Sequence, residues 1–212
     1  MVSFPLEVEI LIKPSGFYTS RKLSLIEALA HGLSNKAIAE ELDLTVKSVE
    51  RILNQLNDKL GNKAGSEFKD LGKVFNPRLR LMAGLISSKI IELKPEIAMR
   101  HIEGLDTNLK RTLILTCIGF ANKTIAEVFG LSDKAIELRL TNLFDYFAVD
   151  TKSQQVENPR CNLFISAYAR GNISKQQLAR LYRETRFSRL DAILTKPDSF
   201  LAGLEDDYKM VG

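Results

Sequence analysis

The stretch Gly32–Leu60, GLSNKAIAEELDLTVKSVERILNQLNDKL, decides the fold, because it reads as two short helices joined by a tight turn. Ser34 and Thr45 carry hydroxyl groups that can accept a backbone N–H bond at the start of a helix. Together they bracket a first helix over residues 35–42. Asp43 tolerates a left-handed backbone and is expected to end that helix. The stretch therefore predicts a helix-turn-helix.

The second helix is expected to begin at Val46 and to bury one apolar stripe. The stripe follows the period of a single helix face, and it comprises Val46, Val49, Leu53, Leu56 and Leu60. The opposite face is polar, and its side chains can bond phosphates and base edges from a helix that fits the major groove of DNA. Its members are Lys47, Ser48, Glu50, Arg51, Asn54, Gln55 and Lys59.

A set of residues at fixed spacing runs through this part of the chain: Thr19, Arg21, Gly32, Ser34-Asn35-Lys36, Ile38-Ala39, Leu44-Thr45, Ser48-Val49 and Lys59-Leu60-Gly61. This set resembles the LuxR-type DNA-binding domain of bacterial transcription regulators. Region 4 of sigma factors has a similar helical pattern, but the Ser-Asn-Lys run favours the LuxR type. Two positions depart from the family: Lys22 stands where a glutamate is usual, and Glu50 where a basic or neutral residue is common.

The resemblance implies that double-stranded DNA is the partner and that the second helix is the recognition helix. The DNA-binding residues expected in this copy are Lys36, Thr45, Lys47, Ser48, Glu50, Arg51, Asn54, Gln55 and Lys59. Arg51 can bond guanine O6 and N7, and Asn54 can bond adenine. Lys36, in the first helix of the motif, can help to hold a phosphate. The alternative is that these residues form a solvated helix face.

A second copy of the pattern follows, with Asp106 corresponding to Thr19 and Asn122 to Asn35, an offset of 87. The duplication extends past the motif, because Asn158-Pro159-Arg160 mirrors Asn76-Pro77-Arg78 at an offset of 82. We therefore predict an all-α fold of two tandem LuxR-type domains with trailing helices. The expected divisions are an N-terminal arm over 1–18, a first domain over 19–104 and a second domain over 105–212.

The second recognition segment, Ser132–Tyr146, has a net charge of −1, whereas Thr45–Lys59 has +1. Its DNA-binding candidates are Lys123, Lys134, Arg139, Thr141 and Asn142. Apolar residues replace polar ones at positions expected to face outward: Leu138 for Arg51, Phe144 for Asn57 and Tyr146 for Lys59. Exposed apolar groups on a recognition helix suggest burial against the first copy, a second subunit or another protein such as RNA polymerase.

The leading functional hypothesis is a sequence-specific transcription regulator that works as a single-chain pseudo-dimer. The alternative is an adaptor or antagonist that uses the fold to bind RNA polymerase or another regulator. A homodimer is a further option for the assembly. An enzyme is not expected, because the sequence shows no phosphate-cradling glycine loop, nucleophile–base pair or metal-ligand cluster. No cofactor is expected either.

Composition agrees with a globular protein of the cytoplasm, associated with the nucleoid. The 212 residues are 45% hydrophobic and 26% charged, with a net charge of +4 that permits nucleic-acid binding. No apolar run is long enough to cross a bilayer, and no signal peptide opens the chain. Cys117 and Cys161 are too few for a disulfide framework and are expected to be small core residues.

The remaining segments carry weaker signals. Alternation from Leu6 to Ile12 predicts a short strand or an extended arm. Asn76 can cap a long helix that continues to about Leu93, before Pro95 breaks it. A C-terminal helix carries the basic residues Lys175, Arg180, Arg183, Arg186 and Arg189, and an acidic tail follows it.

Overall fold

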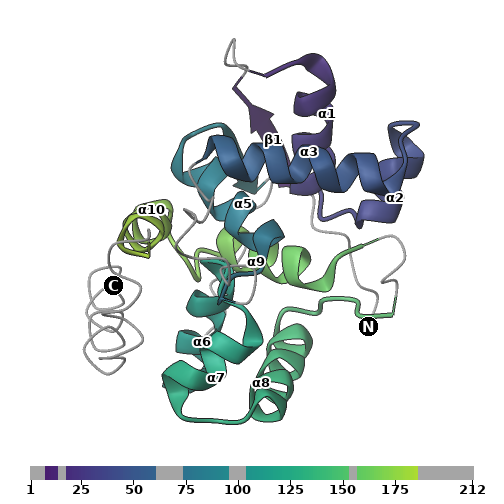
Figure 1. The fold of residues 1–212 in the computed structure, drawn as a ribbon. Coiled ribbons are helices and arrows are strands. Elements are labelled where there is room, and N and C mark those ends of the chain that lie inside the picture. Colours follow the sequence, from purple (N-terminus) through teal and green to yellow (C-terminus); the bar gives the residue numbers. More distant parts are fainter. Residues whose placement is uncertain (1–7, 14–17, 61–73, 96–103, 153–156, 186–212) are drawn as a thin grey trace.

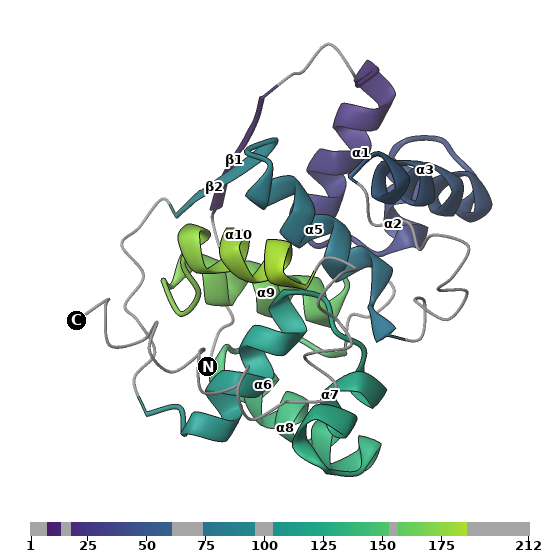
Figure 2. The same ribbon diagram turned by 60° about the vertical axis from the view of Figure 1, so that its left-hand side comes forward.

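A computed structural model describes residues 8–13, 18–60, 74–95, 104–152 and 157–185, which are mostly helical. In chain order the elements are β1 (Val8–Ile12), α1 (Ser20–Ala30), α2 (Asn35–Glu41), α3 (Val46–Lys59), α5 (Pro77–Ser87), β2 (Ile91–Pro95), α6 (Thr107–Cys117), α7 (Asn122–Phe129), α8 (Asp133–Tyr146), α9 (Pro159–Ala169) and α10 (Lys175–Glu184). Figures 1 and 2 show α1, α2 and α3 at one end of the molecule and α6, α7 and α8 at the other, with α5 and α9 between them.

Several helices begin at polar N-cap residues, and the cap at Asn76 was predicted from the sequence. The Asp106 carboxylate accepts the Leu109 N–H at the start of α6, with the oxygen 2.9 Å from the nitrogen. Asn76 caps α5 through its side-chain oxygen, and Pro77 occupies the first turn. Thr19 is the N-cap residue of α1, but its side chain makes no capping hydrogen bond.

The prediction of a long helix that runs to about Leu93 is wrong. Helix α5 ends at Ser87, and Lys89 then adopts a left-handed backbone with φ +58°. The next residues form β2, which pairs antiparallel with β1 and sets Ile91 opposite Ile12. Ile91 and Leu93 are buried on either side of a half-buried residue, so burial alternates as in a strand. The all-α expectation is corrected accordingly, because the mostly helical fold also contains a two-stranded sheet.

The buried apolar residues of both ends form one continuous cluster. Leu25 and Leu29 of α1 are fully buried in this cluster. Cys117 and Cys161 are also fully buried, which confirms their prediction as core residues. The trailing helices pack across the middle, with α5 against α6 and α9, and α9 against α1.

Short backbone contacts join the two ends at the loops that precede α2 and α7. Leu33 forms an antiparallel bridge with Glu157, and Phe75 forms one with Phe120. The aromatic rings of the second bridge are stacked with centroids 5.0 Å apart. Helix α10 then packs on α5. Of the predicted basic C-terminal residues, Arg186 and Arg189 lie outside the described residues.

Candidate nucleic-acid interface

The turn between α2 and α3 has the geometry predicted from the sequence. Ser34 Oγ accepts the Ala37 N–H at 3.2 Å, and Thr45 Oγ1 accepts the Ser48 N–H at 3.1 Å. Asp43 has φ +49°, so it ends the first helix in the left-handed region as expected. Both side-chain caps are therefore confirmed, and they fix where each helix of the motif begins.

The inner face of α3 holds the helix against its neighbours α2 and α5. Val49, Leu53, Leu56 and Leu60 are buried as predicted, and Ile52 is buried with them. The inclusion of Val46 in the stripe was wrong, because this first residue of α3 is 41% exposed. The stripe starts one turn later, and the opposite face of the helix is free to carry other side chains.

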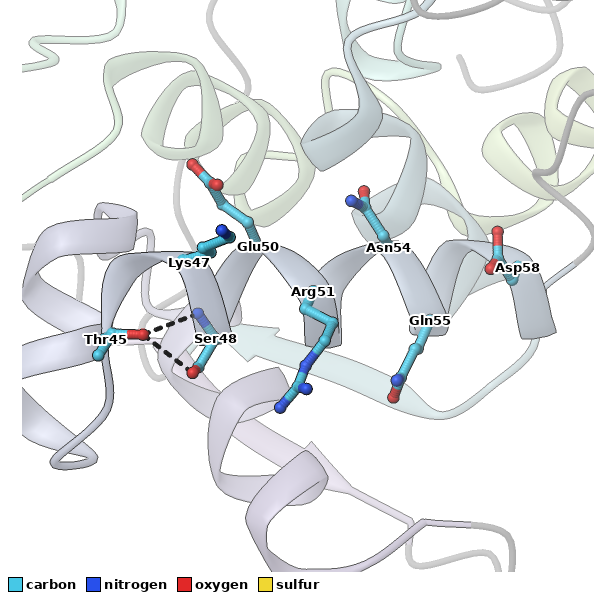
Figure 3. A pocket seen from close by; sticks show the side chains of 8 residues that line it. All are labelled: Thr45, Lys47, Ser48, Glu50, Arg51, Asn54, Gln55 and Asp58. Atoms are coloured by element: carbon cyan, nitrogen blue, oxygen red, sulfur yellow. Dashed lines mark hydrogen bonds between the residues drawn. The ribbon is translucent and has the colours of Figure 1, made fainter.

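The outer face of α3 is a continuous polar surface (Figure 3). An open hollow along it is lined by Thr45, Lys47, Ser48, Glu50, Arg51, Asn54, Gln55 and Asp58. Figure 3 shows Glu50 and Asn54 projecting along one edge of the helix, and Arg51 and Gln55 along the other. The sequence-predicted residues of α3 thus lie together, and Asp58, which the sequence analysis did not include, joins them.

This surface alternates in charge, and its cations differ in how freely they can reach a ligand. Within the described part of the chain, Lys47 and Arg51 are exposed and form no ion pair. Lys59 is also exposed, but its Nζ lies 5.3 Å from the centroid of the Tyr18 ring. The half-buried Ser48 hydroxyl is 2.9 Å from Thr45 Oγ1. Lys47 and Arg51 are therefore the cations best placed to meet an anionic partner.

Residues 17–67 match the family model described as "Bacterial regulatory proteins, luxR family". The chain carries a luxR-family helix-turn-helix domain. A domain of this family indicates a DNA-binding transcription regulator, and the family consists of regulators rather than enzymes. Searches of curated proteins and of solved structures found no match to the chain.

Asn57 of the luxR-family domain is buried, so its prediction as an outward residue was wrong. Its amide nitrogen donates to the Leu53 carbonyl at 3.2 Å and to the Pro77 carbonyl at 3.1 Å. Sequence spacing placed it beside the polar face, but the start of α5 covers this position. Asn57 ties α3 to α5 instead of facing a ligand.

Arg78 adjoins the luxR-family domain and was missed as a candidate. Its guanidinium donates to the Asn35 side chain and to the Leu33 carbonyl, and its Nε donates to Cys161 Sγ at 3.2 Å. A second hollow, between α2, α3 and the start of α5, is lined by Asn35, Glu50, Leu53, Asn54, Asn57, Pro77 and Arg78. The repeated Asn-Pro-Arg triplet was the sequence signal that could have pointed to this residue.

Helices α7 and α8 expose all but one of the DNA-binding candidates predicted for this part of the chain. Lys123, Lys134, Thr141 and Asn142 are exposed, as is Lys36 of the luxR-family domain. Arg139 is half-buried, with its guanidinium carbon 4.7 Å from the centroid of the Phe129 ring. Arg139 lies 87 residues after the buried Ile52, and it packs inward rather than facing outward.

The apolar residues of α8 that were predicted to face outward are partly exposed and partly half-buried. Leu138 is 63% exposed and Tyr146 is 47% exposed, in agreement with their predicted outward direction. Phe144 is half-buried and packs against the core, so its prediction as an outward residue was wrong. It lies 87 residues after Asn57, and both positions are turned away from solvent.

The described residues contain no group of three or more His, Cys, Asp or Glu side chains placed to hold a metal ion. None of their helices is long and apolar enough to cross a membrane. His101, one of the two histidines, lies outside the described residues.

Proposed function

We propose that this protein is a sequence-specific DNA-binding transcription regulator and that it binds as a single-chain pseudo-dimer. Half one comprises α1, α2, α3 and α5, and half two comprises α6, α7, α8 and α9. Helix α3 would read one half-site, and α8 a second. Such a protein would act in the cytoplasm, on the nucleoid. The luxR-family match to residues 17–67 carries the DNA-binding part of the proposal.

The outer face of α3 supports direct reading of DNA. Arg51 is exposed and projects beside Gln55, so its fork of N–H donors is available for guanine. Lys47 and Lys36 are exposed near the starts of α3 and α2, where they can neutralise phosphates. Glu50 lies on the same surface and would oppose phosphate unless it accepts a hydrogen bond from cytosine.

The bounds of the helices support the pseudo-dimer. Helices α1, α2 and α3 begin at residues 20, 35 and 46, and α6, α7 and α8 begin at 107, 122 and 133, always 87 later. The starts of α5 and α9, at 77 and 159, differ by 82. Equivalent side chains also make equivalent bonds, since Arg78 donates to Asn35 and Arg160 donates to Asn122.

The contacts between the halves are reciprocal, and this observation favours a two-fold arrangement. The Asn158 N–H donates to the Gly32 carbonyl at 2.7 Å, and the Asn76 N–H donates to the Gly119 carbonyl at 2.7 Å. The residue numbers of the two donors differ by 82 and those of the two acceptors by 87, which are the offsets between the corresponding helices. The two backbone bridges, Leu33 with Glu157 and Phe75 with Phe120, are exchanged in the same way. Residue i contacting j while j contacts i defines an isologous interface.

DNA reading is tested with the full chain on duplexes selected from a random pool. We expect a defined motif, and we expect Arg51→Ala to weaken binding to it about 5-fold to 150-fold, the value of a bidentate guanine contact. Arg183→Ala is the matched control, because Arg183 is an exposed arginine on α10. Equal binding by the Arg51→Ala variant and the wild type would show that α3 does not read bases.

The pseudo-dimer is tested by stoichiometry and footprint. We expect one chain to cover two half-sites, as measured by sedimentation of the protein–duplex complex and by footprinting. In the Lys134→Ala variant of α8, the half-site bound by α8 should lose its footprint at a higher protein concentration than the half-site bound by α3. A footprint that spans a single half-site, or two chains on a two-site duplex, would refute the single-chain assembly.

A second candidate function is an adaptor or antagonist that binds RNA polymerase or another regulator. The exposed Leu138 and Tyr146 on α8 favour it, because exposed apolar groups can be covered by a protein partner. Salt dependence separates the two functions. DNA affinity should fall steeply as salt rises, whereas an adaptor would retard no duplex even at low salt.

A further inference from the structure

Helices α3 and α8 present the same set of positions to solvent. Both have 14 residues, and their N-caps Thr45 and Ser132 have nearly the same backbone angles, with ψ 150° and 154°. After the first residue of each helix, seven exposed positions of α3 remain exposed in α8, and the pairs are Lys47/Lys134, Glu50/Glu137, Arg51/Leu138, Asn54/Thr141, Gln55/Asn142, Asp58/Asp145 and Lys59/Tyr146. Corresponding side chains therefore leave their helices in the same direction.

The largest chemical change among these pairs is at the centre of the face. Arg51 carries five N–H donors and a charge, whereas Leu138 is purely apolar and 63% exposed. The pairs Lys47/Lys134 and Glu50/Glu137, which precede this position, are unchanged. Half two thus keeps the two charged pairs before the centre of the face and replaces the charged central contact with an apolar one.

We propose that α8 reads a half-site that differs from that of α3 at the central base pair, with guanine facing Arg51 and thymine facing Leu138. This inference rests on the proposed function. Guanine offers the O6 and N7 acceptors that an arginine binds, while the C5 methyl of thymine is the apolar group that the major groove presents. The class of ligand is therefore a duplex with two unequal half-sites.

The surroundings of Leu138 favour a base edge over a protein surface. Its exposed neighbours on the helix face are Lys134, Thr141 and Asn142, at spacings of three and four residues. Among the described residues of this half, the other large exposed apolar side chains, Leu131 and Tyr146, are about two helical turns away along the chain. Protein interfaces are apolar and depleted of charge at their centre, whereas one apolar side chain among polar ones matches a thymine methyl among phosphates.

The reciprocal contacts between the halves set the expected order of the two half-sites. Helices related by a two-fold axis read inverted half-sites. The operator should therefore be an inverted repeat, with guanine in one half at the position where the other half has thymine. Ser132–Tyr146 is less basic than Thr45–Lys59, so half two contributes less to DNA affinity. Its main contribution is discrimination between base sequences.

The first experiment selects duplexes with wild-type protein, with Leu138→Arg and with Arg51→Leu. We expect an unequal inverted repeat for the wild type, guanine in both halves for Leu138→Arg, and thymine in both for Arg51→Leu. Leu131→Arg is the matched control, because it adds the same charge beside α8 without changing the central position, and it should leave the base preference unchanged.

The second experiment removes only the methyl group. Deoxyuridine replaces the thymine assigned to Leu138, and we expect roughly fourfold weaker binding, the value of one buried methyl group. The Leu138→Ala variant should show no such loss on the same pair of duplexes. An unchanged affinity on uracil, or an unchanged second half-site with Leu138→Arg, would overturn the inference.

The outcomes separate this inference from the function beneath it. A selected motif that keeps guanine opposite Arg51 but has no second half-site overturns the inference and leaves DNA reading by α3 intact. Failure to select any duplex overturns both. If Leu138→Arg releases a bound protein while the DNA motif stays the same, α8 is a protein-docking helix and the inference is wrong.

Discussion

Gly32 lies directly against Asn162, so closely that a Cβ atom at Gly32 would overlap the Asn162 side-chain oxygen. Position 32 has φ +78°, which L side chains rarely adopt. Gly119 is its counterpart, with φ +98°, and a Cβ there would lie 2.7 Å from the Arg80 backbone nitrogen. Both glycines let the backbone of one half approach the trailing helix of the other.

Alanine at these glycines should destabilise the fold. We expect Gly119→Ala to cost more than Gly32→Ala, because its obstacle is main chain rather than the end of a flexible side chain. Gly130→Ala is the control, since Gly130 has φ +63° but open space around it, and it should cost about 1–2 kcal/mol. Urea unfolding measures the order. Equal losses at Gly32, Gly119 and Gly130 would mean that the close approach contributes nothing.

Replacing Arg80 should cost much stability for a charged residue, because its side chain is buried where three segments meet. Its Nη1 donates to the Ile118 carbonyl at 3.2 Å and to Thr185 Oγ1 at 2.6 Å, and its Nη2 donates to the Tyr182 carbonyl at 3.2 Å. The guanidinium also lies over the Phe75 and Tyr182 rings. We expect Arg80→Met to lower the free energy of unfolding by about 2–4 kcal/mol, by leaving buried acceptors unpaired.

The same change at Arg183 supplies the comparison for Arg80. Arg183 is exposed on α10, and its Nε donates to the Ala179 carbonyl of its own helix. We expect Arg183→Met to change the free energy of unfolding by less than about 0.5 kcal/mol. If Arg80→Met unfolds at the same urea concentration as Arg183→Met, the junction does not depend on the guanidinium.

The buried thiols should make stability fall at alkaline pH. Burial raises the pKa of both Cys117 and Cys161 above the ordinary thiol value, although Arg78 opposes the rise at Cys161. Their contribution is fully present below the unfolded pKa of about 8.5 and is lost as pH rises toward the folded pKa. Between about pH 8.5 and 10 we expect a loss of up to about 1.4 kcal/mol per pH unit for each thiol.

Urea unfolding across that range measures the effect of the thiols. A variant with Cys117→Ala and Cys161→Ala should lose the slope while remaining folded at neutral pH. Tyr18 and Tyr168, whose pKa values burial also raises, titrate above this window. A slope that persists without either cysteine would assign the alkaline loss to other groups.

Glu50 should weaken DNA binding through its charge. Its carboxylate is exposed on the face that carries Arg51 and Lys47. We expect Glu50→Gln to raise affinity for non-specific duplex severalfold at low salt, because one repulsive charge is removed. Glu27→Gln, an exposed change on α1, should have a smaller effect. Weaker binding by Glu50→Gln, confined to duplexes with one particular cytosine, would instead make Glu50 a base reader.

Local chemistry was enough to predict the helix-turn-helix. The caps at Ser34 and Thr45 and the left-handed turn at Asp43 depend on neighbours within four residues, so the sequence contains the whole cause. The resemblance at residues 17–67 could be stated for the same reason, since the motif residues are close in sequence.

Long-range contacts were not predictable in the same way. Strand β2 exists because β1, some 80 residues earlier, supplies its partner, and the apolar run before Pro95 also fits a helix. Asn57 looked solvent-facing until the Pro77 carbonyl was placed beside it. Arg78 and Arg80 acquire their roles from residues far away in sequence, among them Cys161 and Ile118 of the other half, which no local pattern identifies.

The hydrogen bonds from Asn158 to Gly32 and from Asn76 to Gly119 involve main-chain atoms only. These main-chain hydrogen bonds require glycine at positions 32 and 119 but do not depend on the identity of the other side chains nearby. Substitutions on the outer faces of α3 and α8 can therefore accumulate separately without loosening the connection between the halves. Arg80 and Asn162 lie 82 residues apart at corresponding places beside these hydrogen bonds, but they differ in residue type and in hydrogen-bond partners.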